Sequence, residues 1–235
     1  MMNPELRRRF VNSIEYLRRM DFFNDYSNLS SEEIFDKILT GEIDYSTQWF
    51  VEKWPEEEQK KKREEGWTYG QILKKSLEER KEHMEYWMKA SDSRIDLEMA
   101  FFDRKRVFVE DWEIEASDGM GISLMKKLAR IARGLFNPTD IREEWERNIR
   151  IRGYDEKVRC KVFFKFRGEE HSVDFTNHGE VLITDPAVKK INELISDTGY
   201  QYYRLHNDID YIVYAVFSNE EVEKLKERRW ELSLP

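Results

Sequence analysis

Hydrophobic positions in the first half of the chain recur at the spacing of amphipathic helices. The first stripe consists of Leu6, Phe10, Ile14 and Leu17. Ser30 and Glu33 form a capping-box pattern that opens the next predicted helix, and Gly41 is expected to close it. Further stripes follow in residues 68–90 and 92–103. The first region of the chain is therefore predicted to be mainly helical.

The hydrophobic period changes in the middle of the chain. Residues 106–115 alternate like a strand, and residues 117–121 form a glycine-containing turn. A helical stripe then follows at Leu124, Leu128, Ile131 and Leu135. Residues 137–140 have the composition of a helix stop followed by a cap, so Ile141 and Trp145 are predicted to begin another helix.

The last third of the chain predicts two hairpins. Residues 158–167 alternate between apolar and mostly basic positions, and residues 172–175 can pair back on them. Residues 200–205 and 211–217 form the second predicted hairpin. The last of these segments is apolar on both faces, which is typical of a central strand.

A helix is predicted after each hairpin. Asp185 is placed to cap the first helix, and Ser218 with Glu221 forms a capping box for the second. We therefore predict an α+β fold in which a mainly helical region, residues 1–150, packs with a small, mostly antiparallel sheet. That sheet, of ββαββα order, belongs to an α+β region at residues 151–235. The two regions could instead form a single domain.

Charge is distributed unevenly along the chain. Residues 126–167 hold thirteen Lys/Arg and six Asp/Glu, a balance of +7, whereas the whole chain is −8 and the remainder is therefore −15. The candidate binding residues of this basic segment are Lys126, Lys127, Arg130, Arg133, Arg159, Lys161, Lys165 and Arg167. They could contact nucleic-acid phosphates, whose counterions are released on binding. They could instead pair with the acidic remainder of the chain.

No residue pattern identifies a catalytic or metal site. His171 and Asp174 fall on opposite faces of a strand, which disfavours shared metal ligation. Cys160 has the position of a buried apolar residue rather than of an exposed nucleophile. The turn at residues 118–121 lacks a phosphate-loop pattern, so a plain strand-to-helix turn is favoured. We expect no cofactor and no enzyme activity, although a hydrolytic site built from distant carboxylates and His171 or His206 stays open.

Composition favours a cytoplasmic protein that does not enter a membrane. No segment approaches the roughly 18 consecutive apolar residues that span a bilayer. The arginines at positions 7–9 are not followed by the apolar region of a secretory signal. A single cysteine excludes an intrachain disulfide framework.

The predicted ββαββα order and the acidic balance resemble those of bacterial immunity-type domains, which bind toxins without catalysis. This resemblance implies a protein partner and no reaction. We therefore expect a non-catalytic protein-binding module, immunity-like or regulatory, that selects its partner by electrostatic complementarity. Nucleic-acid binding or processing through residues 126–167 is the alternative.

Overall fold

The computed structural model describes residues 2–43, 60, 64–66, 75, 87–111, 118–151, 154–178, 181–206 and 211–235. The chain forms two compact units, unit 1 (Met1–Arg104) and unit 2 (Lys105–Pro235). The described part of unit 1 is helical, whereas unit 2 contains both helices and strands. No helix in the described part of the chain is long and apolar enough to cross a membrane.

Unit 1 contains the helices α1 (Pro4–Arg18), α2 (Ser31–Thr40) and α5 (Asp92–Ala100), with 3-10 turns at η1 (Asn24–Tyr26) and η2 (Trp87–Lys89). The predicted capping box is present at Ser30 and Glu33, and Gly41 ends α2 in the left-handed conformation with φ 80°. Ser91 caps α5 by accepting a hydrogen bond from the Arg94 amide at 3.3 Å. The stripe in residues 92–103 therefore begins a helix of its own.

Apolar packing and arginine contacts, among them those of Arg9, hold the described part of unit 1 together. Phe10 on α1 and Phe35 on α2 are buried, and their rings stack with centroids 5.3 Å apart. Arg9 on α1 donates hydrogen bonds to the Met88 carbonyl oxygen at 2.9 Å and to the Asp92 carboxylate at 2.8 Å. These two contacts fasten α1 to the segment that leads into α5.

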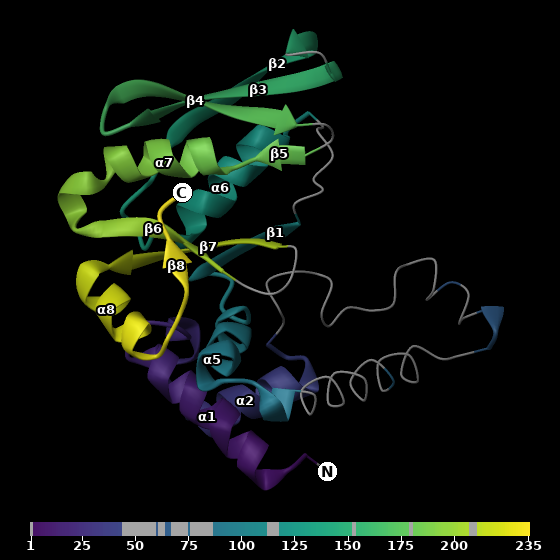
Figure 1. The fold of residues 1–235 in the computed structure, drawn as a ribbon, viewed down its shortest axis with the longest axis vertical. Coiled ribbons are helices and arrows are strands. Elements are labelled where there is room, and N and C mark those ends of the chain that lie inside the picture. The colour runs from purple at the N-terminus through teal and green to yellow at the C-terminus, as the bar shows by residue number, and fades with distance from the viewer. Residues whose placement is uncertain are drawn as a thin grey trace. The chain divides into compact units, whose positions relative to one another are not determined.

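Unit 2 is built on two four-stranded antiparallel sheets (Figure 1). The first has the order β1-β7-β6-β8 and consists of β1 (Val107–Asp111), β6 (Tyr200–Leu205), β7 (Tyr211–Ser218) and β8 (Leu232–Ser233). The second has the order β2-β3-β4-β5 and consists of β2 (Thr139–Ile151), β3 (Tyr154–Phe166), β4 (Glu169–His178) and β5 (Val181–Ile183). Both sheets are antiparallel, and side chains alternate between the two faces of a strand except where the β2–β3 register shifts.

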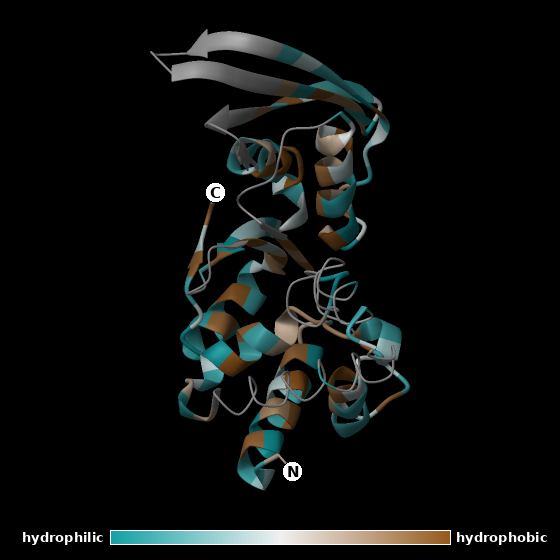
Figure 2. Ribbon diagram, turned by 90° about the vertical axis from the view of Figure 1, so that its right-hand side faces the viewer, coloured by the Kyte–Doolittle hydropathy of each residue, from teal (hydrophilic) through white to brown (hydrophobic). Residues whose placement is uncertain are grey.

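Two helices lie between the sheets of unit 2 (Figure 1). They are α6 (Met120–Ile131) and α7 (Asp185–Leu194), while α8 (Asn219–Glu227) covers the opposite face of the first sheet. One apolar core joins both sheets and both inner helices, and it includes Leu128, Val162, Ile191 and Val216. Figure 2 shows hydrophobic and hydrophilic residues alternating along the helices, as amphipathic elements require.

Polar side chains fix α6 and α7 to the first sheet. Asn192 on α7 accepts a hydrogen bond from the Tyr202 amide at 2.7 Å and donates one to the Tyr202 carbonyl oxygen at 3.0 Å. The Tyr202 hydroxyl donates to the Leu128 carbonyl oxygen on α6 at 2.8 Å. The Asn192 amide thus satisfies backbone groups of β6 at a position that the two-residue strand β8 does not reach.

The α+β class predicted from the sequence is confirmed, but the sheet structure is more extensive than expected. The sequence predicts one small sheet late in the chain, whereas the described residues form two sheets. The strand predicted over residues 106–115 is present as β1, and the strand that begins at Thr139 is not predicted. From Tyr154 onward the order is β3-β4-β5-α7-β6-β7-α8-β8. The predicted ββαββα order is therefore not confirmed in detail, because β5 lies within it and β8 follows its last helix.

The helix predicted to begin at Ile141 and Trp145 is wrong, because both residues lie in β2. A spacing of four fits one turn of a helix, but it also fits two residues on the same face of a strand. The residue between them on that face is the charged Glu143, which conceals the apolar alternation. Its inward position has a structural reason, because its carboxylate caps α6.

Two predictions, the helix over residues 68–90 and the boundary between residues 150 and 151, are not decided by the described residues. The helix predicted over residues 68–90 lies mostly outside the described residues. The predicted boundary between residues 150 and 151 falls within β2, which pairs with β3. The division of the chain into residues 1–150 and 151–235 stays a prediction.

Stability of the protein is expected to fall as the pH rises from about 4.5 to about 7 because of Glu98 on α5. Burial raises the pKa of Glu98 from 4.5 to about 7, and Arg94 only partly opposes this. The folded state therefore favours the protonated carboxyl group, and its stabilisation is lost as pH rises through the folded-state pKa. The loss is on the order of 3 kcal/mol for a shift of this size.

Urea unfolding of the wild type and of Glu98→Gln at pH 5 and pH 8 checks this prediction. The neutral amide should remove most of the difference between the two pH values. Glu15→Gln, a change in an exposed ion pair with Arg19, is the matched control and should keep that difference. An unchanged pH dependence in Glu98→Gln would contradict the prediction.

Candidate functional site

The side of β2, β3 and β4 that faces away from the core presents alternating charges. Across the strands, Lys161 on β3 is opposite Glu144 on β2 and Asp174 on β4. Directly opposite residues of an antiparallel pair lie on the same face. The intervening β3 residues, Cys160, Val162 and Phe164, are buried in the core. We call the solvent side the outer face, defined by Arg142, Glu144, Lys161, Phe163, Lys165, Glu170 and Asp174.

Ion pairs and one aromatic ring organise the outer face. Arg142 forms an ion pair with Glu170 at 2.5 Å, and Lys165 forms one with Asp140 at 2.7 Å. The Arg142 guanidinium and the Lys161 ammonium lie 4.7 and 5.2 Å from the centre of the Phe163 ring. The hydrogen bond from Lys165 lowers the pKa of Asp140. Because more than half of each paired side chain is exposed, these pairs shape the surface more than they stabilise the fold.

The structure does not bring the eight predicted basic residues into one surface. Lys161 and Lys165 share the outer face. Arg159 lies on the same strand, where its backbone position is opposite Glu146 on β2 and Thr176 on β4. Lys126 and Arg130 are exposed on α6, with Lys127 half-buried beside them. Since α6 packs against the core side of this sheet, these helix residues cannot lie on its outer face.

The other two predicted residues contact carboxylates within unit 2. Arg167, in the turn between β3 and β4, forms an ion pair with Asp197 at 2.8 Å. Arg133, just after α6, forms one with Glu221 at 2.7 Å. The interpretation that the basic segment pairs with acidic residues of the same chain therefore holds for several of its members.

The N-terminus of α6 is capped by a carboxylate from the neighbouring sheet. Glu143 on β2 accepts hydrogen bonds from the Gly119 amide, from the Ile122 amide at 3.0 Å and from the Trp145 indole at 2.7 Å. An internal anion thus occupies the backbone amides that a phosphate would use. This geometry supports a structural turn at residues 118–121 rather than a phosphate cradle.

Residues considered for metal binding or nucleophilic chemistry are not arranged for either. His171 is opposite Phe164 and Asp174 is opposite Lys161, so the two lie on different faces of β4 as expected. Burial, with a smaller effect of Glu143, raises the pKa of Cys160 to about 12. A thiol with such a pKa is a poor nucleophile near neutral pH. Among the described residues no group of three His, Cys, Asp or Glu could hold a metal ion.

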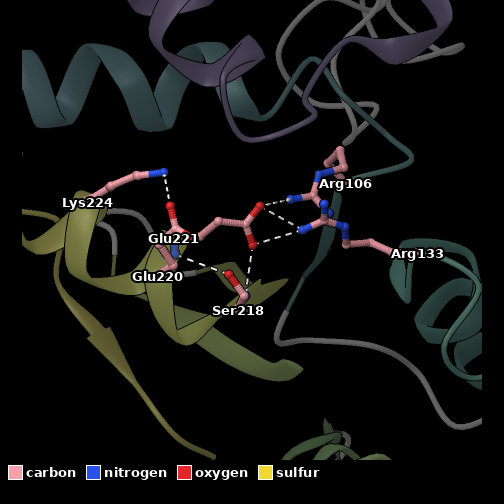
Figure 3. A network of polar contacts seen from close by, with 6 residues as sticks. All are labelled: Arg106, Arg133, Ser218, Glu220, Glu221 and Lys224. Carbon is pink, nitrogen blue, oxygen red and sulfur yellow. Dashed lines mark hydrogen bonds and ion pairs between the residues drawn. The ribbon is translucent and has the colours of Figure 1, made fainter. Parts of the chain in front are cut away.

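A buried carboxylate, Glu221 on α8, is contacted by two arginines (Figure 3). The Arg133 Nη1 donates to both carboxylate oxygens, at 2.7 and 2.8 Å, and the Arg106 Nη2 lies 4.0 Å from Oε1. The Ser218 amide donates to Oε2 at 2.8 Å, which completes the capping box of α8. The Glu221 and Arg106 side chains are only 11% and 6% exposed. The contacts of Glu221 are therefore largely shielded from solvent.

The Glu221 network joins elements that are distant in the sequence. Arg106 precedes β1, Arg133 follows α6, and Glu221 begins α8. Arg133 is held in the left-handed region at φ 57°, a conformation unfavourable for residues other than glycine. Its guanidinium also lies over the Tyr200 ring at 4.9 Å. These contacts compensate for the backbone strain and fix how α6 ends.

Sequence reasoning identifies Glu221 only as a helix cap. The partner of its carboxylate, Arg133, is 88 residues away, and no local spacing connects the two. Arg106 has no special pattern around it either. The capping-box signal at Ser218 was the one available indication, and it concerns the backbone rather than the ion pair.

Replacing Glu221 with glutamine is expected to destabilise the protein by about 3 kcal/mol, because the buried Arg106 and the partly buried Arg133 lose their shared carboxylate. Glutamine can still accept at the helix cap, so the change isolates the charge. The exposed Glu223, paired with Lys226, offers Glu223→Gln as a matched control that should change stability far less. Urea unfolding measures both variants, and equal effects would show that the network contributes little.

Replacing Glu143 with alanine is expected to cost about 1–2 kcal/mol, because three N–H donors lose their acceptor. The adjacent Glu144 lies on the outer face, where Glu144→Ala should have little effect on stability. The difference between the two free energies of unfolding is the quantity to measure. A Glu143→Ala protein as stable as Glu144→Ala would rule out an important capping role.

Comparisons with family models, with curated proteins and with solved structures each find no match to this chain. The function must therefore be inferred from the geometry of the described residues.

Proposed function

We propose that this chain is a non-catalytic protein-binding module, immunity-like or regulatory, and that the outer face of β2, β3 and β4 is its contact surface. The observation that supports this most is the position of Phe163. It lies on the solvent side of β3, and Arg142 and Lys161 approach its ring. Aromatic and arginine side chains are enriched where protein interfaces derive most of their binding energy.

The mixed charge of the outer face also fits a protein partner. Cations on β3 alternate with carboxylates on β2 and β4, so a partner with the complementary pattern would be steered into one orientation. Such a surface selects by pattern rather than by total charge. A cytoplasmic location, expected from the sequence, is part of the same proposal.

The nucleic-acid alternative has weaker support. Polyanion binding depends on several cations that are free to neutralise phosphates together. Here Lys165, Arg167 and Arg133 each contact a carboxylate of the same chain. These carboxylates partly neutralise the positive charge of residues 126–167, so fewer cations are available to phosphates than the net charge of +7 indicates.

The proposal is tested by capturing partners from lysate with the wild type and with Phe163→Ala combined with Lys161→Glu. We expect a discrete protein that survives nuclease treatment on the wild type and binds the double variant at least about tenfold more weakly. Lys190→Glu, which changes an exposed ion pair on α7, is the matched control and should retain the partner.

Two outcomes would contradict the proposal. A partner that binds the double variant as well as the wild type would place the contact elsewhere. Recovery of nucleic acid that is lost between low and moderate salt would instead favour phosphate binding through the basic residues. Circular dichroism of each variant confirms that the fold is retained.

A further inference from the structure

Three polar side chains lie together where β6 and β8 pair, on a different sheet from the outer face. Arg204 and Ser233 are directly opposite each other in the two strands, so their side chains share a face. The His206 Nε2 lies 2.9 Å from the Ser233 hydroxyl oxygen. The His206 amide donates to the Glu231 carbonyl oxygen at 3.0 Å, which continues the pairing beyond β6. Backbone register therefore sets the positions of all three residues.

Arg204 is oriented by a carboxylate that is itself anchored. The Arg204 Nη1 donates to the Asp185 carboxylate at 3.3 Å, and the other oxygen of this carboxylate accepts from the Tyr214 hydroxyl. A guanidinium group has five N–H donors, and this contact occupies one of them. Both side chains of the pair are more than one third exposed, so the contact is screened by solvent and easily rearranged.

We propose that Arg204, His206 and Ser233 form a binding site for the phosphate group of a small phosphorylated molecule. A guanidinium can hold two phosphate oxygens at once, which is stronger than its long contact with Asp185. When the His206 Nε2–H donates to the Ser233 oxygen, the serine hydroxyl hydrogen can donate to the anion from the same face. Asp185 occupies the side of Arg204 near α7, so the anion approaches from the side of Ser233 and His206.

The site is independent of the proposed protein-binding surface. Its residues come from the first sheet, whereas the outer face belongs to the second sheet. Phosphate binding can therefore fail while protein binding through Phe163 is retained, and the reverse also holds.

The experiment is a titration of the full chain with inorganic phosphate and, separately, with glycerol 3-phosphate, at constant ionic strength set with sodium chloride. Calorimetry or NMR of the His206 ring reports binding. We expect saturable binding that is weakened at least about tenfold in Arg204→Gln and measurably in Ser233→Ala. Tighter binding of glycerol 3-phosphate than of phosphate identifies a phosphate ester as the ligand, and the opposite order identifies the free anion.

Arg167→Gln is the matched control. Arg167 also forms an exposed ion pair, with Asp197 at 2.8 Å, but it is not part of the Arg204 group. Its variant should bind as the wild type does. Absence of saturable binding, or equal weakening in Arg167→Gln and Arg204→Gln, would overturn the proposal. Ser233→Ala keeps the Arg204–Asp185 contact, so its effect does not depend on a change in the start of α7.

Discussion

The close approach of α6 to β3 is the constraint on which the architecture of unit 2 depends. A side chain at Gly121 would place its Cβ only 2.6 Å from the Cys160 sulfur and from Val162, so glycine is required there. This proximity lets Glu143 on β2 reach the first amides of the helix. One side of the second sheet is thereby covered by α6, and most charged residues of β2, β3 and β4 lie on the other side, toward solvent. The outer face is a consequence of that packing.

Much of the fold can be predicted from local patterns, and the exceptions have physical causes. Alternation in residues 158–167 identifies β3, and the capping residues Ser30 and Ser218 identify two helix starts, because these signals act over a few residues. The strand β2 is missed because Glu143, a charged residue, occupies an inward position of the strand. It does so because its carboxylate caps the N-terminus of α6. The contact of Arg133 with Glu221 could not be predicted, since it depends on how α6 and α8 pack.

Charge counted along the sequence differs from charge arranged in space. The fold distributes the basic segment over three places: an exposed side of α6, the outer face, and two ion pairs with Asp197 and Glu221. On the outer face, strand pairing places carboxylates opposite the lysines of β3. A linear count of +7 therefore overstates the positive potential that a partner would encounter. Screening at physiological ionic strength further reduces the contribution of the exposed groups.

The Glu221 network is unusual because one carboxylate serves two purposes. It accepts from the Ser218 amide to start α8, and it neutralises Arg133 at the end of α6. Two elements on opposite faces of the first sheet are therefore positioned by the same group. A buried ion pair is weak evidence for stability, since apolar replacements often do as well. Its value here is better explained by geometry: an apolar cluster could fill the space, but it would not fix the left-handed turn at Arg133 and the start of α8 together.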